Sequence, residues 1–373
     1  MHILIIRTAT ALGGAEIYNI RLIQGFRKYY PDVSFSFITN FDEFGQRLRE
    51  LGVPVELIPI FNEEVGTKKG LFRLIKIYPI YIYQYLKAIR SINKKRKIDI
   101  ILMQSTTEKI ALSIYLLFFG FRILWLEHGM FETDKKIFFI KFLYKIFKCP
   151  IITVSNTIKE DLKRLSLKKI IVVKTGFNIK SLNKKVNKLL NPNKLIISFI
   201  GSISDGKGIK DFFIISQIII KKKLNVFFTI VGTGPKLAWL KNTVNDSNKK
   251  YYSIKGSVNN INPYINKSDL LLFPTYSEGL SLVILELMAN GIPVITRDIG
   301  GNNELVIHNK TGLLFKNETH EQIAQMAIDL LNDPERRKKM GEAARERIKK
   351  YFSEERWIRE MNQVFQEVTS GEN

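Results

Sequence analysis

Short apolar runs alternate with amphipathic stretches along the first part of the chain. The runs Ile3–Ile6, Ser34–Thr39 and Val55–Ile58 have the length and β-branched or aromatic content of buried strands. The intervening segments Ile17–Lys28 and Phe44–Leu51 carry apolar residues at helical spacing. Strands that alternate with helices predict a parallel sheet, so the pattern indicates an α/β fold.

The alternation continues to about residue 178 and then starts again after a polar segment. We expect the first set to continue with helix Leu71–Asn93, strand Ile98–Met103, helix Lys109–Phe119, strand Phe121–Leu126, strand Ile151–Val154 and helix Asn156–Leu165. Lys180–Lys194 is rich in Asn and Lys, which predicts a linker. The second set comprises strands Leu195–Ile200, Val226–Val231, Tyr251–Gly256, Leu270–Phe273, Val294–Thr296 and Gly312–Phe315, with helices Ile209–Lys221, Lys236–Val244, Thr319–Leu331, Glu335–Lys350 and Ser353–Val368.

Two doubly wound units follow from this pattern. We place the first domain at residues 1–178, the linker at 179–194, the second domain at 195–352 and a C-terminal helix at 353–373.

The stretch Phe273–Glu304 is the densest in candidate chemistry. The loop Thr275–Ser281 joins a buried strand to an apolar helix, and ligands of open α/β sheets bind outside the carboxyl ends of the strands. Glu278 lies in this loop, and Glu286 interrupts the apolar face of the helix. A buried carboxylate needs a partner, and paired sugar hydroxyls would serve. The alternative is that Glu286 pairs with an Arg or a backbone group, while Glu278 is a solvated turn residue.

Glycine-rich loops open helices at two further places. Gly13 and Gly14 precede the first helix, and the loop Gly201–Ile209 holds Lys207 before another helix. Glycines at a helix N-terminus let backbone N–H groups approach an anion, and a lysine can neutralise a diphosphate. The alternatives are a tight turn that requires positive φ at the first loop and a surface turn at the second. Val231–Pro235, with the sequence VGTGP, is interpreted as a structural turn.

His128 follows the expected strand Phe121–Leu126 directly, in the sequence Glu127-His128-Gly129. A histidine at the carboxyl end of a parallel strand can face a ligand. The alternative is a structural histidine held by hydrogen bonds.

The segment EGLSLVILELMANGIPVIT, followed by GGNNE and TGLLF, resembles the donor-site signature of the retaining glycosyltransferases of family 4. Nine positions match the family pattern at its spacing: Glu278, Gly279, Leu282, Glu286, Met288, Ala289, Gly291, Pro293 and Val294. Leu280 replaces the usual aromatic residue, Leu287 the usual Ala. Ser202 stands where the family has Arg, which is the better bidentate phosphate ligand.

The resemblance implies the GT-B fold, in which two Rossmann-like domains face each other across a cleft. In that fold the first domain would bind the acceptor and the second the nucleotide sugar, and the C-terminal helix at 353–373 would cross back to the first domain. It also implies transfer of a hexosyl group from a nucleotide sugar, with a UDP-sugar favoured, to a hydroxyl with retention of configuration. Glu286 would bind the ribose hydroxyls, Glu278 the donor sugar, and Lys207 with Gly13–Gly14 the diphosphate, while His128 would lie near C1. Further donor-binding positions implied by the resemblance are Gly201, Ser202, Gly256, Gly279, Leu280, Ser281 and Leu282.

Composition bears on partners and location. The chain has 58 Lys and Arg against 35 Asp and Glu, a net charge of +23, which favours acidic partners such as nucleotides or an anionic membrane. Lys135–Phe147 is basic and aromatic and could lie on such a membrane, the alternative being a core-facing helix with a basic edge. One cysteine, Cys149, and no long uncharged apolar run predict a cytoplasmic protein, peripheral on the inner face of the cell membrane.

The acceptor is expected to be a glycan or lipid-linked molecule of cell-surface polysaccharide, lipopolysaccharide or glycolipid synthesis. No motif for nucleic acid is present, and no metal-ligand spacing occurs, so we expect neither an essential metal nor a cofactor. Two other functions stay open: a nucleotide-sugar epimerase of the same architecture, and a degenerate membrane or nucleotide-binding scaffold, for which Ser202 is the hint.

Overall fold

The computed structural model describes residues 1–9, 11–58, 68–129, 144, 146, 149–179, 194–222, 225–244 and 246–371. It divides into two compact units: the first comprises Met1–Val154, Ile158–Val173 and Trp357–Asn373, and the second comprises Ser155–Thr157 and Lys174–Arg356. Residues 180–193 of the expected linker, and all of Lys135–Phe147 except Tyr144 and Ile146, lie outside the described residues.

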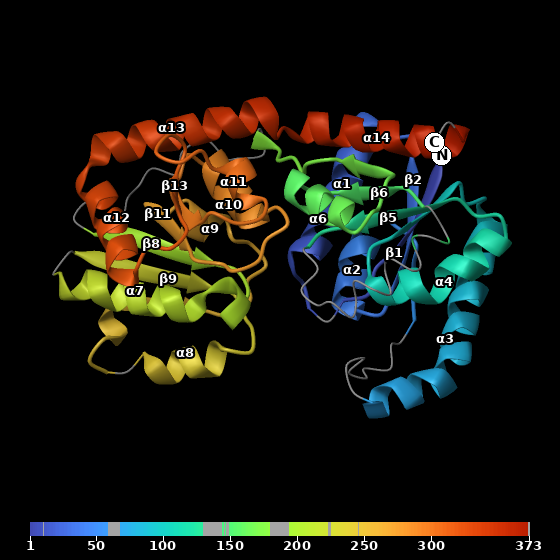
Figure 1. Ribbon diagram of the computed structural model, residues 1–373, viewed down its shortest axis with the longest axis horizontal. Helices are drawn as coiled ribbons and strands as arrows, with labels where there is room; N and C mark the ends of the chain where they lie inside the picture. Colours follow the sequence, from blue (N-terminus) through green and yellow to red (C-terminus); the bar gives the residue numbers. More distant parts are fainter. Residues whose placement is uncertain are drawn as a thin grey trace. The chain divides into compact units, whose positions relative to one another are not determined.

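The first unit is built on a seven-stranded parallel sheet with the order β3-β2-β1-β4-β5-β6-β7 (Figure 1). Its strands are β1 (His2–Ile6), β2 (Ser34–Thr39), β3 (Val55–Leu57), β4 (Ile100–Met103), β5 (Ile123–Glu127), β6 (Ile151–Thr153) and β7 (Ile170–Val172). Its helices are α1 (Gly14–Tyr29), α2 (Asp42–Glu50), α3 (Lys68–Lys95), α4 (Thr106–Phe118), most of α6 (Asn156–Arg164) and, from Trp357 on, α14 (Glu354–Ser370). The strand order changes direction between β1 and β4, which is the switch point of this sheet.

Residues from both ends of the sequence contribute to the core of the first unit. All five residues of β1 are buried because strands flank it on both sides and helices cover the sheet. Helix α14 packs against α1: the ring of Trp357 lies 4.9 Å from that of Tyr18, and Phe365 stacks on Phe26 at 5.5 Å.

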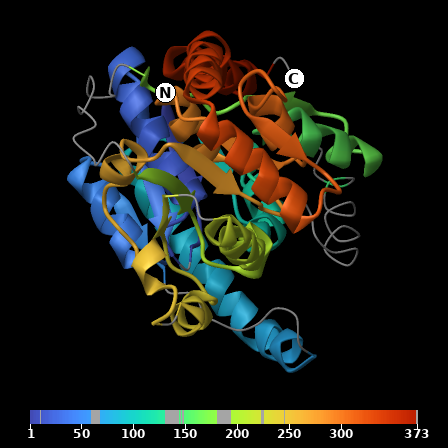
Figure 2. The same cartoon turned by 90° about the vertical axis from the view of Figure 1, so that its left-hand side faces the viewer.

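The second unit has six parallel strands in the order β10-β9-β8-β11-β12-β13. They are β8 (Leu195–Ile200), β9 (Val226–Val231), β10 (Tyr252–Lys255), β11 (Leu270–Phe273), β12 (Val294–Arg297) and β13 (Leu313–Phe315). The helices are α7 (Ile209–Lys221), α8 (Leu237–Thr243), α9 (Asn262–Ile265), α10 (Leu282–Ala289), α11 (Asn302–Leu305), α12 (His320–Asn332) and α13 (Pro334–Tyr351). Helix α12 packs against α7, and Figure 2 shows the two helices side by side. The switch point lies between β8 and β11.

The expected elements are confirmed, and some of their boundaries agree to the residue. Strands β2, β8, β9 and β11 and helix α7 have the predicted bounds. Helix α1 begins at Gly14 rather than Ile17, and α4 at Thr106 rather than Lys109, because the first turn of each helix precedes its first large apolar residue. None of the described helices is long and apolar enough to cross a membrane.

Candidate functional site

Two loops of the second unit meet at its switch point. The loop after β8 runs from Gly201 to Gly208 and includes a 3-10 turn, Asp205–Lys207, while the loop after β11 runs from Pro274 to Ser281. The two strands are hydrogen-bonded neighbours, so both loops emerge at the same edge of the sheet. This edge is where doubly wound folds bind ligands.

Four hydrogen bonds tie the loops together. Lys207 Nζ donates to the backbone O of Ser277 at 3.0 Å and to Oε1 of Glu278 at 2.8 Å. The backbone O of Gly206 accepts from the N of Tyr276 at 2.9 Å and from Oγ1 of Thr275 at 3.2 Å. Lys207 has three N–H donors, so it holds the second loop with two and has the capacity for one further acceptor. Glu278 is therefore an ion-pair partner and not a solvated turn residue.

Glycines allow the loops to approach so closely. Gly208 has φ +75°, and a Cβ there would lie 2.1 Å from the backbone O of Pro274. Gly301 lies against the second loop in the same way: its Cβ would lie 2.0 Å from the O of Gly279, and its N donates to the O of Glu278 at 3.2 Å. These positions admit no side chain, so glycine fixes the loop spacing.

Two more lysines flank the first loop. Asp205 pairs with Lys236 at 3.1 Å and with Lys210 at 3.2 Å, and the hydrogen bond from Lys236 is the main cause that lowers the pKa of Asp205. Ser202, which replaces the family's arginine, is exposed on this loop. Lys236 and Lys210 thus supply positive charge near the place where the arginine is missing, which the sequence did not reveal.

Helix α10 holds the second carboxylate. Glu286 is 4% exposed and sits among buried Leu285, Leu287 and Met288. Ser281 caps the helix by accepting from the N of Ile284, so its hydroxyl supports the start of α10. Gly279 and Leu280 are buried, whereas Leu282 is partly exposed.

A charged cluster braces the second loop from α7, β12 and α12. Asp211 accepts from the hydroxyl of Tyr276 at 2.5 Å, pairs with Arg297 at 3.2 Å, and lies 3.1 Å from Nε2 of His320. The Arg297 guanidinium also covers the Tyr276 ring at 4.3 Å. The hydrogen bond to Asp211 raises the pKa of Tyr276. No local sequence pattern predicts this cluster, because its members come from separate elements.

In the first unit, His128 lies beside helix α1. Its ring meets Tyr18 edge-on at 4.6 Å, and its Nε2 lies 3.4 Å from Oε1 of Gln104. Desolvation lowers the pKa of His128 well below its usual range, and the charges of Arg7 and Lys109 add to this effect. His128 is therefore a neutral hydrogen-bonding group at neutral pH. It is partly exposed, and so it retains access to solvent.

The first glycine loop is already occupied by a carboxylate. Glu16 Oε2 accepts from the N of Gly13 at 2.9 Å, and its Oε1 accepts from Nε of Arg7 at 2.9 Å. Gly13 has φ −122°, and Gly14 is not among the positive-φ residues, so the idea that this turn requires positive φ is wrong. Glu16 thus places a carboxylate at the N-terminal end of α1, the end that attracts negative charge.

The structure thus brings Lys207 and Glu278 together in the second unit, with Gly201, Gly279, Leu280 and Ser281 on the same pair of loops and Leu282 as the first residue of α10. Gly256 follows β10, and its O accepts from the N of Gly232 at 3.1 Å. The glycines Gly232 and Gly234 pack on the backbone of Gly201 and Ile203, which confirms the structural role of that turn. His128 and Gly13–Gly14 belong to the first unit.

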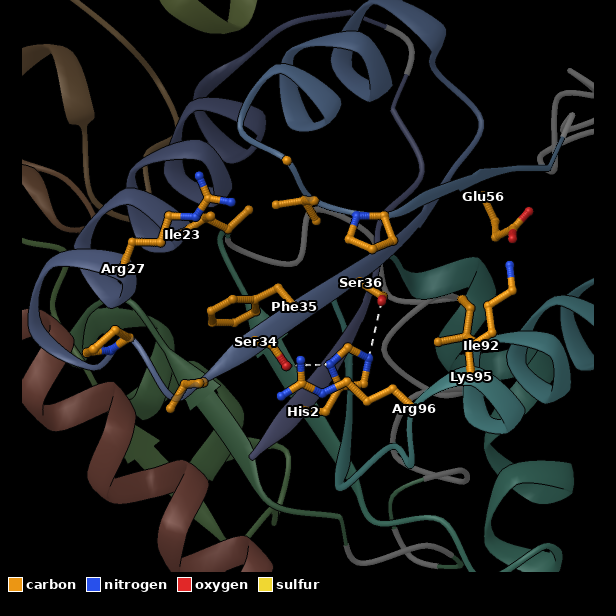
Figure 3. A pocket seen from close by; sticks show the side chains of 15 residues that line it. His2, Ile23, Arg27, Ser34, Phe35, Ser36, Glu56, Ile92, Lys95 and Arg96 are labelled. Atoms are coloured by element: carbon orange, nitrogen blue, oxygen red, sulfur yellow. Dashed lines mark hydrogen bonds between the residues drawn. The ribbon is translucent and has the colours of Figure 1, made fainter.

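A cavity of about 400 Å³ lies at the opposite, amino edge of the first sheet (Figure 3). The His2 ring lies at its floor, hydrogen-bonded to Ser34 at 2.8 Å and Ser36 at 3.2 Å. Arg27 and Arg96 line its wall. Since ligands of this sheet type bind at the carboxyl edge, we do not assign the cavity to the candidate site. Within the described ranges, no three His, Cys, Asp or Glu side chains are grouped as metal ligands.

Comparison with known proteins finds similarity to glycosyltransferases. Residues 180–347 match the family model described as "Glycosyl transferases group 1". The capsular polysaccharide biosynthesis glycosyltransferase CapM of Staphylococcus aureus is 29% identical over 178 residues, which cover 46% of each chain. An uncharacterized glycosyltransferase of Haemophilus influenzae is 25% identical over 346 residues, covering 89% of this chain and 91% of that one. The chain thus spans about half the length of CapM and most of the second relative.

Solved structures share the architecture of the whole chain. HepE of Anabaena, in complex with UDP and glucose, superposes with a TM-score of 0.82 at 17% identity, covering 98% of this chain and 99% of that one. The fold is GT-B, with two Rossmann-like domains. Together with the family model, the matches support the group 1 glycosyltransferase superfamily.

Proposed function

We propose that the protein is a retaining glycosyltransferase that moves a hexosyl group from a nucleotide sugar, with a UDP-sugar favoured, to a hydroxyl of a glycan or lipid-linked acceptor. The observation that carries the proposal is the ion pair of Lys207 with Glu278, which joins the loops after β8 and β11 at the switch point. HepE, which has the same fold, is described with UDP and glucose, and this favours a UDP-sugar.

In this proposal the second unit binds the donor. Lys207 directs its remaining N–H at the leaving diphosphate, and Lys236 adds positive charge from the same side. Glu278 holds the ammonium of Lys207 in place, and the amides that follow it face the sugar. Glu286, on the buried face of α10, accepts from the ribose hydroxyls.

The transfer needs no covalent protein intermediate. The bond between C1 and the diphosphate oxygen breaks, and its electron pair stays on the diphosphate, where Lys207 stabilises the charge. The acceptor oxygen bonds to C1 on the same face, and its proton passes to the departing phosphate oxygen. Neutral His128 serves as a hydrogen-bonding group that orients the sugar near C1, and neither a metal nor a cofactor is required.

Two observations bear on the acceptor: the net charge of the chain and the name of a relative. CapM is named for capsular polysaccharide biosynthesis. With a net charge of +23, the chain suits an anionic or lipid-linked acceptor at the inner face of the cell membrane. Products would belong to capsule, lipopolysaccharide or glycolipid synthesis.

The test is product analysis with radiolabelled UDP-glucose, UDP-N-acetylglucosamine, UDP-galactose and GDP-mannose, each with a membrane lipid extract as acceptor. We expect one donor to label a lipid-soluble product, and NMR of its anomeric proton to show the α configuration of the donor. A β-linked product would contradict retention. Interconversion of the nucleotide sugars without transfer would identify an epimerase, and binding without either reaction would identify a scaffold.

A further inference from the structure

Exposed apolar side chains gather on α3 and at the end of α4. Of the thirteen large hydrophobic residues exposed in the described part of the chain, seven lie between residues 80 and 119: Ile80, Tyr83, Ile114, Tyr115, Leu117, Phe118 and Phe119. We call this set the α3–α4 surface. Phe118 is 87% exposed, the highest value of the thirteen, although a phenylalanine is ordinarily buried. Single exposed residues need no explanation, but a cluster of this kind marks an interaction site.

The two helices form one surface because they lie side by side (Figure 1). Near the start of α4, the hydroxyls of Tyr81 and Tyr85 donate to the buried carboxylate of Glu108 at 3.0 and 3.4 Å. Near its end, the guanidinium of Arg90 lies 5.0 Å from the Phe119 ring. The two contacts are separated by about 14 Å along α3, from Tyr81 to Arg90, and by about 17 Å along α4, from Glu108 to Phe119. Because these separations are similar and in the same order, the two helices run parallel.

On one exposed face of α3, apolar residues are followed by basic residues. Ile80, Tyr83, Lys87, Arg90 and Lys94 follow each other at steps of three and four, and all are exposed, so they form one face of the helix. The face changes from apolar to basic along its length. The exposed Arg122 adds a further cation just beyond α4.

Acidic residues are missing from these segments of the sequence. Residues 68–98 contain no Asp or Glu and ten Lys or Arg, and residues 109–126 contain no Asp or Glu. A surface that combines rings, long cationic side chains and no acids is complementary to anionic lipid headgroups above an acyl layer. Protein–protein interfaces, by contrast, are depleted of lysine in their cores.

We propose that the α3–α4 surface docks on an anionic lipid bilayer. Phe118, Ile114 and Tyr83 enter the boundary between headgroups and acyl chains, and Lys87, Arg90 and Lys94 lie among the headgroups. The surface belongs to the first unit, whereas the donor loops belong to the second. The proposal goes beyond the transfer reaction, because vesicle binding requires no turnover.

The test is flotation of the full chain with vesicles of phosphatidylcholine alone and with vesicles that also contain phosphatidylglycerol. We expect binding to the anionic vesicles at 0.1 M salt and a severalfold loss near 1 M, where the screening length falls from about 10 Å to about 3 Å. The variant Ile114→Ser/Phe118→Ser should reduce partitioning by about tenfold or more, because it removes two apolar anchors. Lys87→Gln/Arg90→Gln should reduce binding to the anionic vesicles severalfold.

Matched controls distinguish vesicle binding by the α3–α4 surface from nonspecific adsorption and from unfolding of the variants. Ile214→Ser/Tyr351→Ser removes two exposed apolar residues of the second unit, and Lys221→Gln/Lys241→Gln removes two exposed charges there. Both controls should bind vesicles like the wild type, and all variants should melt like it. The proposal is overturned if Ile114→Ser/Phe118→Ser binds as the wild type does. It is also overturned if light scattering shows a dimer which that variant dissociates while the wild type ignores vesicles, since the surface would then bind a second copy.

Discussion

The loop after the first strand differs between the two units, although both sheets have the same strand arrangement around it. In the first unit, the first turn of α1, the helix that follows β1, carries Glu16, whose carboxylate accepts from the N–H of Gly13 and pairs with Arg7. In the second unit, the loop after β8 carries Lys207, which pairs with Glu278 and retains a free donor capacity. The first unit thus places a carboxylate at the N-terminus of the helix that follows its first strand, whereas the second unit places a lysine with one remaining donor in the corresponding loop.

This difference indicates which of the two units binds the donor phosphates. A carboxylate at a helix N-terminus already satisfies the partial positive charge there, so a diphosphate would have to compete with it. The loop after β8 has Lys207, Lys210 and Lys236 close to it. We infer that the second unit is the main site for the donor phosphates and that Gly13 and Gly14 contribute less.

The largest effect is expected for Lys207→Ala. Loss of one preorganised charge at a leaving group costs about 10²–10³ in kcat, so transfer should fall by this factor. Steady-state kinetics with the active donor measure it. The exposed Lys241→Ala is the control and should keep the wild-type rate; an equal loss in both variants would contradict a local role for Lys207.

Gly208→Ala tests the close approach of the donor loops. The new Cβ would lie 2.1 Å from the O of Pro274 at a residue with φ +75°, which we expect to lower the free energy of unfolding by about 2–5 kcal/mol. Gly206→Ala, two residues earlier, meets no atom within 4 Å and should change it by less than about 0.5 kcal/mol. Denaturant unfolding measures both, and equal effects would show that the loops are not packed as described.

Glu16→Gln sharpens the comparison from the other side. The change removes the ion pair to Arg7 and weakens the cap on Gly13, so the free energy of unfolding should fall by about 1–2 kcal/mol. Donor affinity should not fall, because the carboxylate is not a ligand of the donor and its negative charge competes with the diphosphate for the helix N-terminus. Calorimetric titration with the nucleotide sugar checks this, and a loss of affinity as large as that of Lys207→Ala would break the comparison.

The smallest effect concerns His128. Its pKa is depressed in the folded state, so the unfolded chain binds the proton more readily below pH 6.5. Its contribution to stability is therefore present above that pH and is lost as the pH falls, with a slope of at most about 1.4 kcal/mol per pH unit. His128→Gln should flatten the slope between pH 6.5 and 5. His2, whose pKa is also lowered by burial, leaves a residual slope; an unchanged slope would contradict a neutral His128.

The sequence predicted the framework well for a physical reason. Parallel strands are buried on both faces, so β2, β8, β9 and β11 are continuous apolar runs whose ends are visible in the sequence. Helices α9 and α11 have four residues each, too few to show a periodicity, and they were missed. Lys207 and Glu278 were predicted only as two separate residues, since no local pattern indicates that residues 71 positions apart will form a pair. For the same reason the contacts of Asp211, Tyr276 and Arg297 were not foreseen.

The most direct test of the account is thermal stabilisation by UDP-, GDP-, ADP- and dTDP-sugars of the wild type, Glu16→Gln, Lys207→Ala and Glu286→Ala. A ligand present at 100 times its Kd stabilises the folded state by about 2.7 kcal/mol. The account predicts that one nucleotide sugar raises the Tm of the wild type and of Glu16→Gln, and that the shift is lost in Lys207→Ala and in Glu286→Ala. If none raises the wild-type Tm at millimolar concentration, or if the shift survives in both second-unit variants, the donor site is not where the structure indicates.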